Sequence, residues 1–179
     1  MRLRVATLSD IPELTKLIER SVAELQAEDY SNDQIAGALG TVYGVDSVLF
    51  EDGTFYVIEL DDGTLAACGG WSQRQTAYGS EHSPVKDDKF LHPSTDAARV
   101  RGYFTDPAYA RKGCATAILA ASEKAAYEAG FRRLQLTATL TGVALYERHG
   151  YTETERLVLD LPNGQKLPVV RMAKRLQAT

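Results

Sequence analysis

Cysteine is scarce in this chain, since Cys68 and Cys114 are the only two among 179 residues. They are far apart and lack the CxxC or Cys/His spacing of a metal site, and two cysteines are too few for a disulfide scaffold. His82 and His92 lie in a polar stretch with no third ligand at a suitable spacing. We therefore expect no metal site, and the cysteine content is typical of a protein from a reducing cytoplasm.

Long apolar runs are missing as well. The sequence has no stretch of about 18 apolar residues that could cross a bilayer, and residues 1–14 lack the apolar segment of a signal peptide. The formal net charge of −4 provides no overall positive field to attract nucleic acid. We expect neither a membrane nor a nucleic acid among the partners of this protein.

The composition is that of one globular domain. A hydrophobic content of 44% suffices for one core in a chain of this length but hardly for two. Internal repeats, low-complexity tracts and a domain-sized change in composition are all absent from the sequence. The sequence therefore predicts a single domain over residues 1–179.

Periodicity and turn residues predict the order of the secondary structure elements. The first helix is capped by Ser9 or Asp10, and a capping box of Ser31 and Gln34 begins the second. Asp62-Gly63 predicts a two-residue hairpin turn with positive φ angles. The helices are expected at about 10–25, 32–39, 113–129 and 142–149, and the strands at 2–6, 54–60, 65–71, 99–105 and 132–139 and on both sides of 162–164.

This order indicates an α/β fold with a mixed central sheet of about seven strands and four main helices. The strand, helix and strand between residues 99 and 138 suggest a parallel crossover. A polar loop over residues 72–98 has no clear period, and a loop of that length in a compact domain is usually functional or mobile.

The sequence DPAYARKGCATAIL at residues 106–119 places two cations and several small residues before a helix. The first turn of a helix presents unpaired N–H groups and the positive end of the helix dipole, which attract anions. Gly113 and Ala115 leave the backbone bare, Arg111 and Lys112 add charge, and Thr116 adds a hydroxyl, so a diphosphate is the predicted ligand. In the alternative interpretation the small residues only allow close packing on the sheet. The Walker spacing is absent, which disfavours a nucleotide triphosphatase.

Two segments resemble the motifs of the GNAT superfamily of N-acetyltransferases. RVRGYFTDPAYARKGCATAIL at 99–119 resembles its central strand, turn and helix, and ALYERHGY at 144–151 resembles its second helical motif. The order of elements also fits that fold over nearly the whole chain. The resemblance implies a single GNAT-like domain, acetyl-CoA as co-substrate, and transfer of acetyl by direct attack of a primary amine on the thioester.

The resemblance also implies roles for individual residues. Tyr146 would protonate the leaving thiolate, and a backbone N–H at Phe104 or Thr105 would polarise the thioester carbonyl. Without the resemblance, Tyr146 is better interpreted as a core aromatic residue on an amphipathic helix. The implied cofactor-binding residues are Phe104, Thr105, Arg111, Lys112, Gly113, Cys114, Ala115, Thr116 and Thr139.

Three positions depart from the family pattern. Ala110 stands where Arg or Gln is usual, Thr139 where many members have Asn, and Gly142 where they have Ala. These departures leave open an alternative, a catalytically silent acyl-CoA sensor. A phosphate-binding module without preference for CoA is a third reading, which Tyr146 and the Gly113 turn argue against.

The acceptor site is the least defined part of the prediction. The loop at 72–98 is expected to form a mildly acidic mouth that attracts a cationic small-molecule or peptide amine, and the strands around 162–172 leave a homodimer open. The candidates for the general base are Glu51, Glu81, His82, Asp96 and Tyr103. The expected substrate contacts are Tyr30, Trp71, Glu81, Asp96 and Tyr103.

Overall fold

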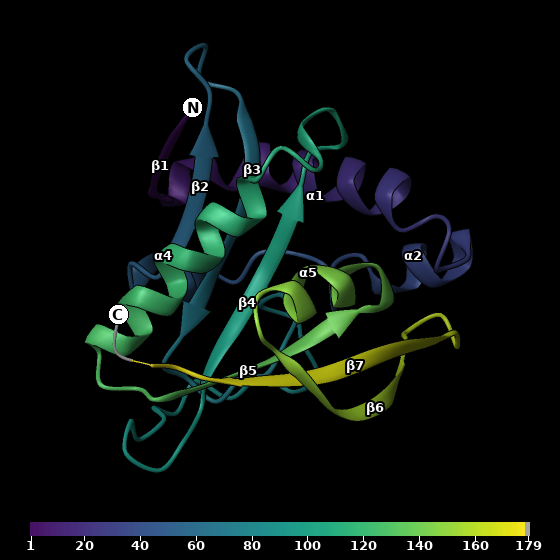
Figure 1. The fold of residues 1–179 in the computed structure, drawn as a ribbon. Coiled ribbons are helices and arrows are strands. Elements are labelled where there is room, and N and C mark those ends of the chain that lie inside the picture. The colour runs from purple at the N-terminus through teal and green to yellow at the C-terminus, as the bar shows by residue number, and fades with distance from the viewer. Residues whose placement is uncertain (178–179) are drawn as a thin grey trace.

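The computed structural model describes residues 1–177 and has one mixed sheet of seven strands in the order β1-β2-β3-β4-β5-β7-β6. Only β4 and β5 pair in parallel, and every other neighbouring pair is antiparallel. The sheet thus has the mixed character expected from the sequence (Figure 1). The strands are β1 (Arg2–Val5), β2 (Phe55–Glu59), β3 (Leu65–Ser72), β4 (Ala98–Thr105), β5 (Arg133–Thr139), β6 (Thr152–Asp160) and β7 (Lys166–Arg175).

Helices cover both faces of this sheet (Figure 1). The α-helices within residues 1–177 are α1 (Ile11–Leu25), α2 (Asn32–Ala38), α3 (Ser47–Glu51), α4 (Cys114–Glu128) and α5 (Val143–Arg148). Helix α1 lies against β3 and β4 on one face, and α4 lies against the same strands on the other. The sequence did not predict α3, because a five-residue helix is too short to show a period. No helix in this part of the chain is both long and apolar enough to span a membrane.

The predicted apolar stripe of the first helix forms part of the core. Four apolar residues of α1 are buried against the sheet, namely Leu14, Leu17, Ile18 and Val22. Their spacing of three and four residues places them on the one helix face that meets the sheet. The capping box of Ser31 and Gln34 is also present at the start of α2.

The hairpin between β2 and β3 differs from the prediction. Leu60 and Thr64 pair across a three-residue loop, with the Leu60 amide 2.8 Å from the Thr64 carbonyl oxygen. Gly63 has a φ of 86°, whereas Asp62 is outside the positive-φ region. The Asp62 carboxylate instead accepts a hydrogen bond from the Thr64 amide at 3.0 Å, which favours an Asx turn over the predicted two-residue turn.

The sheet opens between β4 and β5. Their pairing is confined to Ala98 with Leu134 and Arg99 with Gln135, after which the two strands diverge (Figure 1). Gly102, with a φ of 71°, forms a bulge in β4 at this point. A Cβ atom there would lie 2.7 Å from Phe55 Cε2, so a side chain does not fit. The bulge and the divergence expose one edge of β4 to a cavity.

A buried ion cluster joins β4 to the segments beside it. The Asp46 carboxylate, whose side chain is fully buried, contacts Arg101 Nη2 at 3.0 Å and Lys86 Nζ at 2.5 Å. Burial alone would raise the pKa of Asp46, but the hydrogen bond from Lys86 and the charge of Arg101 outweigh it and lower the pKa below its ordinary value. Asp46 is also the N-cap of α3, so the cluster ties α3, β4 and the 72–98 loop together.

Replacing Asp46 with asparagine is expected to destabilise the fold by about 3 kcal/mol, because it leaves two cations without their buried counter-charge. Urea unfolding measures this loss. Asp160→Asn is the matched control, since Asp160 pairs with Lys166 at 2.6 Å on the surface and its loss should cost less than about 1 kcal/mol. An equal loss of unfolding free energy in the two variants would contradict a stabilising role for the buried cluster. The stabilisation that ionised Asp46 contributes to the fold is fully present above its ordinary pKa of 3.8. It is lost as the pH falls through the pKa of Asp46 in the folded protein, which lies below that value.

Candidate active site

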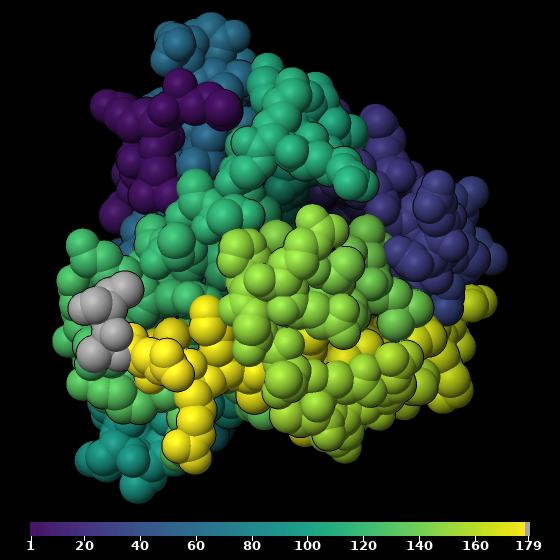
Figure 2. Space-filling view, in the orientation of Figure 1, coloured from purple at the N-terminus to yellow at the C-terminus, as the bar shows by residue number. Residues whose placement is uncertain are grey.

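A cavity of about 210 Å³ lies where β4 and β5 diverge. In the space-filling view, the green surface of α5 faces the teal turn before α4 across a recess (Figure 2). The cavity is lined by α1 and its end, by two loops, by β4, and by parts of α4, β5, the turn after β5, α5 and β7. In this order, the lining residues are Ser21, Leu25 and Gln26; Val42, Tyr43, Gly44, Ala77, Tyr78 and Gly79; Val100 to Thr105; and Ala115, Thr137, Ala138, Thr139, Thr141, Gly142, Leu145, Tyr146 and Val169.

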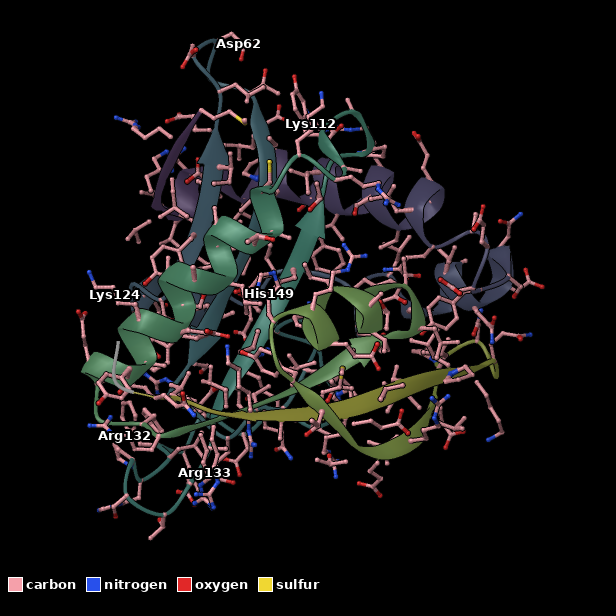
Figure 3. The ribbon with its side chains drawn as sticks, viewed as in Figure 1. Asp62, Lys112, Lys124, Arg132, Arg133 and His149 are labelled. Atoms are coloured by element: carbon pink, nitrogen blue, oxygen red, sulfur yellow. The ribbon has the colours of Figure 1, made fainter. Side chains whose placement is uncertain are left out.

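The turn before α4 has the conformation that an anion site requires. Gly113 has a φ of 84° and is the N-cap of α4, with no side chain capping the helix. Within residues 1–177, the amides from Arg111 to Thr116 donate no hydrogen bond. Arg111 and Lys112 are exposed, and Figure 3 labels Lys112 at this turn. Free amides, a helix dipole and two cations therefore lie together at one end of α4.

Arg111 adds a feature that the sequence did not predict. Its φ of 61° is the one positive value among the non-glycine residues that the structure describes. Such a conformation costs about 1–3 kcal/mol and is concentrated at functional sites. The local sequence gives no signal of this conformation at Arg111, which lies between η2 (Pro107–Tyr109) and α4.

The start of α4 also contacts the end of α5. Thr116 Oγ1 lies 3.1 Å from His149 Nε2, and Figure 3 shows His149 between the two helices. His149 lies within the second motif, directly after Arg148, but its position there gives no signal of a contact with Thr116, which is 33 residues away in the sequence. The contact brings a titratable group close to the free amides of the turn.

The edge of β4 presents one weakly bonded amide to the cavity. Asp106 donates its N–H to the Ala66 carbonyl of β3 at 2.9 Å. Because successive amides of a strand alternate in direction, the Phe104 amide also faces β3 and the Thr105 amide faces the opening. The Thr105 amide lies 3.3 Å from Ser21 Oγ, a long hydrogen bond. Of the two predicted carbonyl-polarising amides, Thr105 is the better placed.

Tyr146 reaches the same cavity from α5. Its side chain is 7% exposed and packs edge-to-face on Tyr103 and Tyr151, with ring centroids 6.1 and 5.7 Å apart. Burial raises the pKa of its phenol well above 10, so the hydroxyl remains protonated. A Cβ atom on Gly142 would lie 3.3 Å from the Tyr146 ring, which explains why glycine suits this position.

These features can be compared with those of known proteins. The sequence profile of the acetyltransferase (GNAT) family matches residues 18–151, three quarters of the chain. The chain belongs to the GNAT acetyltransferase family. It is therefore an acetyl-CoA-dependent N-acetyltransferase, as the motifs around Gly113 and Tyr146 predicted.

Solved structures have the same fold as this acetyltransferase. The GCN5-related N-acetyltransferase from Rhodopseudomonas palustris has a TM-score of 0.72 at 20% identity, over 98% of this chain and 95% of that one. PaiA N-acetyltransferase from Thermoplasma acidophilum, in complex with coenzyme A, has a TM-score of 0.64 at 16% identity over 98% of both chains. A phosphinothricin acetyltransferase from Sinorhizobium meliloti, in complex with acetyl-CoA, has 0.63 at 18% identity over 98% and 88%. No curated protein matches the sequence.

Of the sequence departures in this acetyltransferase, Thr139 has a clear local role. Its hydroxyl accepts a hydrogen bond from the Gly142 amide at 3.2 Å and so begins η3 (Leu140–Gly142). The residue lines the cavity, but its side chain is partly occupied with this cap. Ala110 ends η2 and contributes only backbone to the turn before α4.

Most of the expected acceptor contacts lie elsewhere in the acetyltransferase. Trp71 is 5% exposed and packs on Phe131 in the core. The Tyr30 hydroxyl donates to the Pro168 carbonyl at 2.6 Å and accepts from the Leu140 amide, so it joins β7 to η3. Neither residue lines the cavity, and both act in packing because their positions between elements bury them.

The polar residues among the expected acceptor contacts either lie outside this cavity or have a hydrogen-bond partner of their own. Glu81 accepts a hydrogen bond from the Ser47 amide at 3.0 Å and lines a separate cavity of about 400 Å³ together with His82. Asp96 accepts from the His92 amide at 2.6 Å, within its own loop. Tyr103 does line the active-site cavity, but its hydroxyl donates to Ser122 Oγ at 2.9 Å.

The expectation of an acidic mouth is wrong for this cavity. No aspartate or glutamate is among its lining residues in the described part of the chain, and Arg101 is the one charged side chain there. The acidic residues of the 72–98 loop instead form local caps and ion pairs, as Asp96 and Asp88 do. The sequence could not show this because the direction of loop side chains depends on tertiary contacts.

Proposed function

We propose that residues 1–179 form one acetyltransferase domain that transfers acetyl from acetyl-CoA directly to the primary amine of a small molecule or peptide. The observation that carries this proposal is one cavity lined by Ala115 in the first turn of α4, by the edge of β4 and by Tyr146. These three places suit the diphosphate, the pantetheine arm and the thioester of the donor.

The diphosphate would be held at the start of α4. Amides from Arg111 to Thr116 supply N–H donors without any side chain to desolvate, and each such bond to a charged group contributes about 1.5–3 kcal/mol. Arg111 and Lys112 add charge from the exposed side. Thr139 would contact the pantetheine from the facing strand β5, and Cys114 contributes backbone only, since its side chain is buried.

The thioester would be polarised by the Thr105 amide. A fixed N–H aimed at the developing oxyanion needs no reorganisation in the transition state. The amine nitrogen attacks the carbonyl carbon and forms a tetrahedral adduct. Collapse of the adduct breaks the C–S bond, releases the thiolate and leaves the acetyl group on the nitrogen, which loses its extra proton to solvent; solvent in turn returns a proton to Tyr146 after it has protonated the thiolate.

Tyr146 would then donate its proton to the thiolate. Burial raises the pKa of the phenol, but the same burial raises the pKa of a thiol bound beside it, so the two groups remain matched. The ring is held by Tyr103 and Tyr151, which fixes the direction of the hydroxyl.

The acceptor amine would lose its proton to solvent before attack, because the cavity is lined by no carboxylate or histidine among residues 1–177. We expect kcat/KM at saturating acetyl-CoA to rise about tenfold per pH unit until the pKa of the acceptor amine. Profiles measured from about pH 6 to 9.5 with two amines of different pKa should bend at different pH values. A bend near 6–7 that is the same for both amines would instead identify an enzymic base.

Thermal shift followed by thiol release tests the proposal as a whole. Acetyl-CoA and CoA should raise Tm while ATP should not, and at least one amine of a broad panel should release free thiol from acetyl-CoA. Stabilisation by ATP alone would overturn the assignment of the diphosphate site. Binding of acetyl-CoA without thiol release on any amine would favour a silent sensor.

A further inference from the structure

We infer that the acceptor of this acetyltransferase carries a carboxylate as well as its amine, and that Arg101 binds this carboxylate in the active-site cavity. The inference rests on the proposed function and defines its substrate class as an amino acid rather than a polyamine or a lysine side chain.

Arg101 is a buried cation with unused donors. Its side chain is 2% exposed, and the residue is one of those that line the cavity from β4. Nη2 donates to Asp46 Oδ2 at 3.0 Å and to the Gly79 carbonyl oxygen at 2.6 Å. Within the described residues, Nε and Nη1 are buried and have no hydrogen-bond partner. Buried guanidinium nitrogens are rarely left without acceptors, so an acceptor supplied by a ligand is a direct explanation.

The counter-charge of Arg101 is incomplete. Asp46 shares its carboxylate with Lys86, which approaches at 2.5 Å. Asp88 also contacts Lys86 at 3.4 Å, but its side chain is 42% exposed and therefore screened by water. The inner part of the cluster, Arg101, Lys86 and Asp46, thus has one more positive than negative charge.

Other arginines strengthen the positive field on this face. Arg99 lies two residues before Arg101 on β4, so both side chains lie on the same face of the sheet. Burial and the charge of Arg171 on β7 lower the pKa of Arg99, whereas the charge of Asp96 raises it. Arg99 donates to Gln135 and Arg171 to Glu155, and neither of them lines the cavity, whereas Arg101 does.

The wall beside Arg101 is built by close backbone contacts. A Cβ atom on Gly79 would lie 2.7 Å from the Thr41 carbonyl oxygen, and one on Gly44 would lie 2.8 Å from Ser80 Cβ. The Gly79 carbonyl oxygen accepts a hydrogen bond from Arg101 Nη2 at 2.6 Å, and the cavity beside it has a volume of about 210 Å³. Because the cavity must also hold the acetyl group of the donor, its volume favours a small acceptor. The positive charge of Arg101 would repel an acceptor that carries a second ammonium group, such as a polyamine.

Matched acceptors test the inference on the wild-type enzyme. Thiol release from acetyl-CoA is measured with a panel of amino acids, each paired with its carboxamide, and with spermidine and Nα-acetyl-lysine. Because an amide lowers the pKa of its amine, rates are compared per neutral amine. We expect at least one amino acid to exceed its amide at least tenfold in kcat/KM. Amides or spermidine acting as well as the acids would overturn the inference while leaving the proposed function intact. Acetyl-CoA binding without any thiol release would overturn both.

Arg101→Lys tests the residue, because it keeps the charge but loses the donor geometry of the guanidinium. We expect the ratio of acid to amide activity to fall at least tenfold. Arg74→Lys is the control, since Arg74 is a half-buried arginine paired with Asp52 and does not line the cavity. An unchanged ratio in a folded Arg101→Lys enzyme, verified by acetyl-CoA binding, would overturn the role of Arg101. If that variant does not fold, competitive inhibition of the wild type by the N-acetyl acid but not by its amide provides the same test, and equal inhibition overturns it.

Discussion

Replacing Tyr146 with phenylalanine is expected to lower kcat about 100-fold, with little change in the affinity for acetyl-CoA. The substitution removes one hydroxyl and leaves the ring contacts with Tyr103 and Tyr151 in place. Loss of general acid catalysis typically costs a factor of about 10² to 10⁴. Steady-state kinetics at saturating acetyl-CoA measure the loss, and Tm verifies that the fold is retained.

Tyr151→Phe is the matched control for this experiment. Tyr151 packs on Tyr146, and its buried hydroxyl has no hydrogen-bond partner among the described residues, but it does not line the cavity. Its removal should change kcat less than about twofold and should affect stability alone, because only groups that act in the transition state alter kcat. If Tyr146→Phe turns over as fast as the wild type, Tyr146 is a packing residue and another group protonates the thiolate.

Gly113→Ala is expected to weaken acetyl-CoA binding by about tenfold or more. Gly113 has a φ of 84°, a conformation that costs other residues about 1–2 kcal/mol. A Cβ atom there meets nothing within 4 Å, so the strain comes from the backbone and is relieved by rotation of the turn. Rotation redirects the amides from Arg111 to Thr116, and the loss of even one bond to the diphosphate costs about 1.5–3 kcal/mol.

Gly164→Ala separates this effect from simple destabilisation. Gly164 has a φ of 80°, also has open space around it, and lies in the turn between β6 and β7. Both variants should lose similar stability in urea unfolding, but only Gly113→Ala should bind acetyl-CoA more weakly by calorimetry. Equal affinities for the two variants would show that the turn before α4 does not hold the donor.

The fold was predictable where local signals agree with tertiary packing. The apolar spacing of α1 and the capping box at Ser31 act within a few residues, and both are present in the structure. The predicted two-residue hairpin turn was wrong because the Asp62 carboxylate accepts a hydrogen bond from the Thr64 amide, and Asp62 does not adopt a positive φ. Helix α3 was missed because five residues are too few to show a period, and its N-cap, Asp46, is held by Lys86 and Arg101 from distant segments.

By itself, the sequence predicted the residues that we propose for the donor side of this enzyme. The turn from Arg111 to Thr116 and the helix that contains Tyr146 are contiguous motifs, whose chemistry depends on backbone amides and on one side chain. Only the tertiary structure points to the acceptor side that we propose, where Arg101 lines a cavity with no carboxylate among its described lining residues, and where Glu81, Asp96, Trp71 and Tyr30 are not part of the lining. That surface is built from β4 and two loops that meet only after folding, and the direction of each side chain depends on contacts across the sheet that no short stretch of sequence contains.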